Sequence, residues 1–410
     1  MRIIYVTNSF PYPLTSGYLR HYFLIRELAR HHHVTLLSIT GASFMDEHAA
    51  ALAPFTERVL TFPRERKSGS LNRNAIRRLR LLVRGDEAVR RMRGALERLL
   101  HEQPFDLMLF SGKRTFPAIA QLPLPPLVAD LCDATSLHIH GSMRYAGLSK
   151  LPQLLLEYQQ VCHVERTLAR SAAHLLFASY RDREALLGLG TAPASVVPNG
   201  VDLEFWRRSS GELGADTIVF TGAMDYPPNT DAALVLIREI LPLVRRRVPD
   251  ARALIVGRDP PPRLVRAGDQ QGVHVTGYVE DVRPFLEQAT VFVAPLRFGA
   301  GIQNKVLEAM AMEVPVVASP IAADGVRAEG SKQAPVEVAH EAPQFAELIT
   351  RQLAKRVTTA APDSEPRRYV ERHFVWRRSG ELLEQVIAEL VPTAATRGVV
   401  STARSQSDVR

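Results

Sequence analysis

Cysteine is scarce in this chain, since Cys132 and Cys162 are the only two among 410 residues. The opening segment, "MRIIYVTNSF", lacks the basic start and long apolar stretch of an export signal. We therefore expect two reduced thiols rather than a disulfide bridge. No apolar run approaches the ~20 residues that cross a bilayer. These absences argue against a disulfide-rich secreted domain and a membrane-spanning protein, and they favour a cytoplasmic location.

Two further motifs are missing. No Gly-x-Gly-x-x-Gly follows the first strand of either half, where the sequence reads "VTNSFPYPLTSG" and "FTGAMDYPPN". This absence disfavours a nicotinamide-dependent dehydrogenase. The histidine triplet at 31–33 is not expected to bind a metal, and His138 and His140 lack a third and a fourth ligand at the spacing of a zinc site. Asp225 in "DYPPN" stands without an Asp-x-Asp motif. The sequence therefore predicts no metal site.

Positive charge is in excess, with a net charge of +8 and a pI of about 9.7. Such a balance favours an anionic partner, which leaves phosphate, nucleic acid and an acidic membrane surface open. Arginines crowd residues 64–93, either as a helix lying on anionic lipid or as a solvated helix packing on its own domain. The second interpretation is preferred because Asp86 and Glu87 interrupt the basic face. The segment has no interleaved aromatic residues, which argues against nucleic acid.

Short β-branched runs alternate with helical patterns along the chain, and this alternation predicts parallel sheets in an α/β fold. A turn cluster at Pro198, Asn199 and Gly200 separates two such series. Two doubly wound domains are expected, and their ligands should bind beyond the carboxyl ends of the strands. Strands are expected at 2–7, 34–39, 107–111, 127–132, 174–179, 217–222, 253–257, 273–277, 291–295 and 314–319.

The stretch "GAGIQNKVLEAMAMEVPVVAS", residues 299–319, predicts a glycine loop, a helix and a strand. A helix that begins after such a loop offers free N–H groups and a positive dipole end to a phosphate. Lys305 could add a charge to the same anion, and Glu308 could accept hydrogen bonds from sugar hydroxyls. A nucleotide would satisfy both. The alternative is a surface pair of charges beside a simple turn.

The same stretch resembles the donor-site motif of the family 4 retaining glycosyltransferases, which have the GT-B fold. "VLEAMAMEVPVVAS", "IVFTGAMDYPPNTDA", "ALIVGRDP" and "VVPNGVD" follow the order of that family. The resemblance extends to about residue 390 and is nearest to bacterial exopolysaccharide and surface polysaccharide transferases. It implies an acceptor-binding Rossmann-like domain at 1–198, a donor-binding one at 199–375, a helix at 376–392 packing back toward the first domain, and a disordered tail at 393–410.

The resemblance also implies roles for individual residues. Glu308 would bind the ribose and Lys305 the diphosphate, while Asp133, after strand 127–132, would orient the acceptor hydroxyl or the donor 6-OH. Arg20 either meets an anion or is a surface charge, and His138 and His140 would share a face if extended. The remaining donor-binding residues are Gly17, Gly222, Tyr278, Val279, Gly301, Ile302, Gln303 and Asn304, with plain packing as the alternative for Tyr278.

One position departs from the family pattern, because Ala300 stands where a first glutamate is expected. The resemblance implies a retaining transferase that moves a sugar from a nucleotide-diphosphate sugar to a glycan or lipid-linked acceptor. It implies no metal, no other cofactor and no nucleic acid, and it leaves peripheral contact with the inner face of an anionic membrane open. A sugar-nucleotide 2-epimerase and a non-catalytic nucleotide-sugar-binding protein remain as alternatives.

Overall fold

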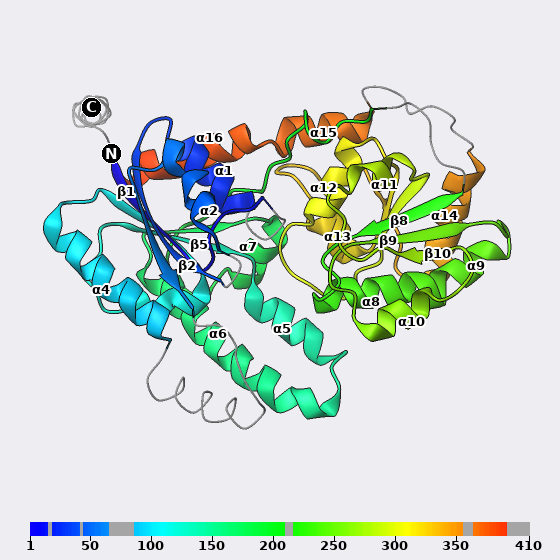
Figure 1. Cartoon of the computed structure of the whole chain (residues 1–410), viewed down its shortest axis with the longest axis horizontal. Coiled ribbons are helices and arrows are strands. Elements are labelled where there is room, and N and C mark those ends of the chain that lie inside the picture. The colour runs from blue at the N-terminus through cyan, green and yellow to red at the C-terminus, as the bar shows by residue number, and fades with distance from the viewer. Residues whose placement is uncertain (15–18, 42–43, 65–85, 210–215, 356–363, 392–410) are drawn as a thin grey trace, which may run out of the picture.

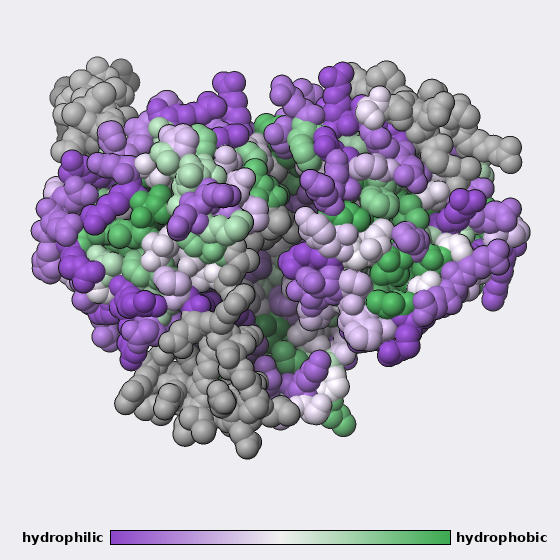
Figure 2. All heavy atoms as spheres, in the orientation of Figure 1, coloured by the Kyte–Doolittle hydropathy of each residue, from purple (hydrophilic) through white to green (hydrophobic). Residues whose placement is uncertain are grey.

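Two α/β domains lie side by side in the computed structural model, and a groove separates them on the face shown in Figure 2 (Figure 1). The structure describes residues 1–14, 19–41, 44–64, 86–209, 216–355 and 364–391. The tail expected at 393–410 and residues 65–85 of the arginine-rich segment lie outside these ranges. The fold agrees with the expected pair of doubly wound domains.

The first domain is built on a parallel sheet with the strand order β3-β2-β1-β4-β5-β6-β7. Its strands are β1 (Arg2–Thr7), β2 (His33–Thr40), β3 (Arg58–Pro63), β4 (Leu107–Ser111), β5 (Leu127–Cys132), β6 (His174–Phe177) and β7 (Ala194–Val196). Its helices are α1 (Leu19–Leu28), α2 (Asp46–Ala50), α4 (Glu87–Glu102), α5 (Thr135–Met143), α6 (Leu151–Ser171) and α7 (Tyr180–Leu186), with 3-10 turns η1 (Ala53–Phe55), η2 (Lys113–Ala118) and η3 (Leu148–Lys150).

The second domain repeats the design with the order β10-β9-β8-β11-β12-β13, again parallel throughout. Its strands are β8 (Thr217–Thr221), β9 (Arg252–Val256), β10 (Val273–Val275), β11 (Val291–Ala294), β12 (Val316–Ala318) and β13 (Glu337–Val338). Its helices are α8 (Pro227–Val235), the π-helical turn η4 (Leu236–Ile240), α9 (Leu241–Arg245), α10 (Pro262–Gly268), α11 (Arg283–Glu287), α12 (Asn304–Ala311), α13 (Pro320–Asp324), α14 (Ala342–Ala354) and α15 (Glu365–His373).

Every expected strand is present, within a few residues of its expected bounds. The sequence analysis did not anticipate β3, β7 and β13, each of which lies at an edge of its sheet. β7 and β13 are too short to show a hydrophobic period, and β3 ends in Pro63. Edge strands are paired on one side only, so the apolar pattern that marks a central strand is weak in them.

The described part of the arginine-rich segment packs on its own domain. Helix α4 buries Val89, Met92, Leu96 and Leu99 in the cluster that covers one face of the first sheet. Its arginines face outward, and Arg90 and Arg93 pair with glutamates of the same helix. The solvated-helix interpretation therefore holds for α4. None of the described helices is both long and apolar enough to cross a membrane.

The last helix, α16 (Trp376–Leu390), returns to the first domain (Figure 1). Leu383, Val386 and Ile387 belong to the same buried cluster as Leu24 of α1. The Trp376 ring stacks on Phe23 with a centroid distance of 4.6 Å. The chain therefore crosses between the domains twice, at the segment near Gly200 and again between α15 and α16.

These two crossings touch at Gly200, which leads to a stability prediction. A Cβ added to Gly200 would lie 2.2 Å from the backbone nitrogen of Trp376, which cannot move aside as a side chain could. Gly200→Ala is expected to lower the free energy of unfolding by about 2–3 kcal/mol, as for other overpacked sites. Urea unfolding followed by circular dichroism measures the loss. Gly147→Ala is the control, because no atom lies within 4 Å of its added Cβ. Equal midpoints for the two variants would contradict the prediction.

Candidate active site

The glycine loop of residues 295–303 leads from β11 into α12 at the edge of the second domain that faces the first (Figure 1). The segment "NKVLEAMA" forms a helix because its apolar residues fall on one side. These are Val306, Leu307, Ala309, Met310 and Ala311, all buried. The expected loop, helix and strand are confirmed. Lys305 consequently lies in the first turn of α12, with Glu308 close behind it.

Lys305 is not a surface charge. Its side chain is partly buried, its Nζ donates to Asn229 Oδ1, and it lies 5.0 Å from the centre of the Phe220 ring. Burial lowers the pKa of Lys305 to about 8, and the nearby Glu308 carboxylate opposes this shift. Burial removes water that would stabilise the charged ammonium group. A bound anion would stabilise that charge in its place, so this position favours anion binding.

Glu308 lies one turn after Lys305 on α12 and lines a pocket of about 170 Å³ between the domains. Burial raises the pKa of Glu308 to about 7, opposed by the Lys305 ammonium. The interpretation of Lys305 and Glu308 as a surface pair is therefore wrong. The other residues that line this pocket are Leu14, Leu19, Phe23, Gly200, Val201, Asp202, Phe205, Trp206, Asn304 and Trp376.

The pocket wall also contacts the segment that carries Tyr278 and Val279. The Arg283 guanidinium, at the start of α11, lies 3.9 Å from the Phe205 ring centre and donates to the Phe205 carbonyl. Tyr278 is 75% exposed, so plain packing does not account for it. Val279 is partly buried against the domain core. Phe205, which lines the Glu308 pocket, is thus held by Arg283, a few residues after the expected base-binding edge.

Gly222 ends β8 beside the side chain that holds Lys305. A Cβ at this position would lie 2.6 Å from Asn229 Nδ2, which itself donates to the Ala223 carbonyl. The missing side chain of Gly222 therefore leaves room for Asn229 and, through it, for Lys305. Gly17, the other glycine expected at the donor phosphates, lies outside the described residues.

One amide of the glycine loop bonds to the first domain, and the amides after it can bind an anion. The Gly301 N–H donates to Asp182 Oδ2 of the first domain at 2.9 Å. Gln303 is buried and Ile302 packs partly against the core. Asn304 begins α12, whose first N–H groups have no partner within the helix. The amides that remain for an anion are those that follow Gly301.

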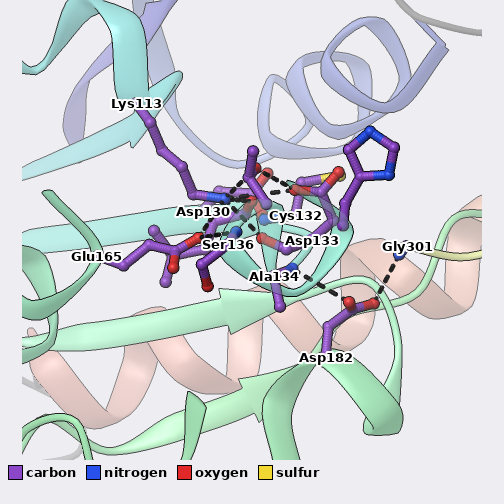
Figure 3. Close-up of polar contacts among 12 residues, drawn as sticks. Lys113, Asp130, Cys132, Asp133, Ala134, Ser136, Glu165, Asp182 and Gly301 are labelled. Carbon is purple, nitrogen blue, oxygen red and sulfur yellow. Dashed lines mark hydrogen bonds and ion pairs between the residues drawn. The ribbon is translucent and has the colours of Figure 1, made fainter. Parts of the chain in front are cut away.

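The first domain brings Asp133 to the glycine loop (Figure 3). Strand β5 ends at Cys132 with a φ of 61°, a conformation that turns the chain sharply. Asp133 Oδ1 then accepts from Thr135 Oγ1 at 2.6 Å and from Lys113 Nζ at 3.3 Å. A Cβ added to Gly301 would lie 3.4 Å from the Asp133 Cβ. Asp133 therefore lies against the donor-side loop.

The structure decides two questions that the sequence left open in this domain. Arg20 is buried and binds both oxygens of Asp130 at 2.8 and 2.9 Å, so it is not a helix-surface charge. His138 and His140 do not share a face, because they lie two residues apart on a helix rather than on a strand. His138 stacks on Tyr226 across the domain boundary, whereas His140 lies near Tyr158. Within the described ranges, no three His, Cys, Asp or Glu side chains are grouped as metal ligands.

Sequence reasoning missed three residues of the site. Lys113 follows the end of β4, a position that could have marked it. Asn229 lies in "IVFTGAMDYPPNTDA", a stretch that resembles the family, but the resemblance gave this residue no role. Asp182 stands three residues after Ser179 in a helix-capping pattern, which identifies a helix start but not a contact with the other domain.

Comparisons with known proteins bear on the fold and on the second domain. Residues 215–355 match the family "Glycosyl transferases group 1". No curated protein matches the chain in sequence. Among solved structures, HepE from Anabaena, solved with UDP and glucose, is 16% identical, with a TM-score of 0.65 over 95% of this chain and 100% of that one.

Two further structures have the same architecture. Sucrose-phosphate synthase from Thermosynechococcus elongatus is 16% identical, with a TM-score of 0.70 over 95% of this chain and 99% of that one. TarM from S. aureus, solved as a point mutant in complex with UDP, is 12% identical, with a TM-score of 0.67 over 94% of this chain and 100% of that one. The chain thus has the GT-B fold, and residues 215–355 of its second domain match a group 1 glycosyltransferase domain.

Proposed function

We propose that this protein is a retaining glycosyltransferase that moves a sugar from a nucleotide-diphosphate sugar to a glycan or lipid-linked acceptor in surface polysaccharide synthesis. The observation that carries the proposal is the placement of Lys305 and Glu308 within the matched group 1 domain. They lie on the first turns of α12, directly after the glycine loop that Asp133 approaches at Gly301. A cation, a hydroxyl acceptor and free amides together suit a nucleoside diphosphate.

In this proposal the diphosphate lies at the start of α12 beside Lys305. The ribose occupies the Glu308 pocket, and the base reaches toward Tyr278. The bond between the anomeric carbon and the diphosphate oxygen breaks, and the acceptor oxygen bonds to the same face of that carbon. The acceptor proton passes to the leaving diphosphate. The protein contributes position and a preorganised positive end, which stabilise the departing charge.

Exposed apolar residues support a lipid-linked acceptor. Leu148, Leu155 and Leu156 are 86%, 51% and 53% exposed where η3 runs into α6 in the first domain. Such side chains suit contact with a lipid or a membrane surface better than contact with a free oligosaccharide. The acceptor panel should therefore contain both polyprenyl-linked and soluble glycans.

The direct test of the proposal begins with a thermal-shift screen against nucleoside diphosphates, since a ligand that binds the native state raises the unfolding temperature. Labelled nucleotide sugars and the acceptor panel follow, and NMR of the product reports its anomeric configuration. Stabilisation by a nucleotide and transfer with retention are expected. If no nucleotide stabilises the protein and no donor is consumed, the proposal is wrong.

Asp133→Asn separates chemistry from donor binding. The amide loses the negative charge that faces the glycine loop, so the transfer rate is expected to fall about 100-fold. Stabilisation by UDP should stay unchanged, because Asp133 belongs to the acceptor side. The measurement is transfer rate beside UDP thermal shift, with Asp46→Asn, an exposed change in the same domain, as control. If Asp133→Asn transfers at the normal rate, Asp133 has no role in the reaction.

A further inference from the structure

The Asp182 carboxylate is fully buried and has no part in the scheme above. It lies in the first turn of α7, and its two oxygens serve different elements (Figure 3). Oδ1 accepts from the Ala134 N–H at 3.1 Å, at the start of the acceptor-side helix α5. Oδ2 accepts from the Gly301 N–H of the donor-side loop at 2.9 Å. One side chain therefore links the two loops that flank the reaction centre.

Helix capping explains only part of this arrangement. Ser179 Oγ accepts from the Asp182 N–H at 3.2 Å and donates to the Asp182 carboxylate, which is the pattern of a helix start. A cap of this kind needs neither Ala134 nor Gly301. The two additional donors come from outside α7, and one of them comes from the other domain. The carboxylate thus does more than begin its own helix.

The neighbouring contacts hold the same loop. Arg181, beside Asp182, donates to the Gly299 carbonyl at 3.0 Å. Gly299 and Gly301 have φ values of 144° and 78°, which residues with a side chain rarely adopt. Because glycine has no side chain to restrict its backbone, this loop is conformationally free. A loop of this freedom needs outside contacts to keep one conformation. Asp182 and Arg181 supply contacts at its amide and its carbonyl.

We infer that Asp182 is a positioning residue, which fixes the glycine loop against the acceptor-side loop so that Asp133 faces the start of α12 at a set distance. This inference rests on the proposed transfer reaction. Removing the link frees the loop without removing any group that touches the donor. A misplacement of about 1 Å at a reacting centre can cost about 100-fold in rate.

Asp182→Asn tests the inference by replacing one acceptor oxygen with a nitrogen that cannot accept. The remaining oxygen can accept from the Ala134 N–H or from the Gly301 N–H but not from both, so the link between the two loops is broken. Hydrogen–deuterium exchange of the free protein should show at least tenfold faster exchange at residues 299–303. Arg181→Ala, a change at a half-buried position, should accelerate the same peptide to a smaller extent. Ser179→Ala, the control, should accelerate only residues 179–186.

Kinetics with whichever donor is used supply the second readout. Asp182→Asn should lower kcat at least tenfold and leave the UDP dissociation constant within threefold of the wild-type value. Unchanged exchange at 299–303 in both Asp182→Asn and Arg181→Ala overturns the inference, as does faster exchange with an unchanged kcat. Should wild-type protein bind no nucleotide and use no donor, the proposed function fails, and the role of Asp182 as a link between the loops is then decided by exchange alone.

Discussion

Glu308→Gln is expected to weaken UDP binding about 100-fold, because the ribose hydroxyls lose a charged acceptor in a pocket largely closed to water. The same change should make the free protein more stable near pH 8. Burial raises the pKa of Glu308 to about 7, so the folded state holds its proton more tightly than the unfolded chain does. Stability therefore falls as pH rises from 4.5 to 7, and the variant lacks this loss.

The gain in stability above pH 7 is expected to be about 1 kcal/mol, since the lost attraction to Lys305 offsets part of it. Titration calorimetry with UDP and urea unfolding at pH 5 and pH 8 measure the two effects. Glu347→Gln makes the same chemical change on the exposed side of α14 and should alter neither. Weaker binding together with higher stability indicates a functional carboxylate. Normal UDP affinity would show that Glu308 is not in the donor site.

Lys305→Met is expected to lower UDP affinity about 30-fold and to remove its dependence on pH. Burial lowers the pKa of Lys305 to about 8, so in the wild-type protein the ammonium loses its proton as pH rises above that value. A bound diphosphate favours the charged form, so wild-type affinity should decline between pH 7 and 9.5. Methionine retains the packing against Phe220 but carries no charge at any pH.

Stability provides an independent check on Lys305. Between pH 8 and 10.5 the unfolded chain binds a proton at this position that the folded state does not, so wild-type stability gains with rising pH. Lys305→Met should lack that gain. Lys355→Met, at the exposed end of α14, serves as the control. A decline in UDP affinity with pH that is identical in wild type and Lys305→Met would assign the titration to another group.

Local pattern was enough for much of the fold. The buried strands are central members of their sheets, and a continuous apolar run identifies such strands regardless of their neighbours. Helix α12 was predictable because "KVLEAMA" combines helix-forming residues with one apolar side. The edge strands β3, β7 and β13 were not, since a strand paired on one side is decided by what lies next to it.

The candidate site likewise contains residues that a local pattern identifies and residues that it does not. Lys305 and Glu308 could be identified because the glycine loop and helix that carry them are contiguous in sequence. Arg20 and Asp130 are 110 residues apart, and Asp182 and Gly301 are 119 apart, so no local pattern joins them. His138 and His140 would share a face only in an extended segment, and here the chain turns into α5.

The sequence by itself therefore determined the two-domain α/β architecture and the donor-side loop, because both follow from periodicity and short-range chemistry. Only the tertiary structure decided which charges are buried and which carboxylates meet at Gly301. The physical reason is that burial and long-range hydrogen bonds depend on how distant segments pack together. The pKa values of Lys305 and Glu308 follow from burial in the folded protein, and the link through Asp182 exists only once the two domains have come together.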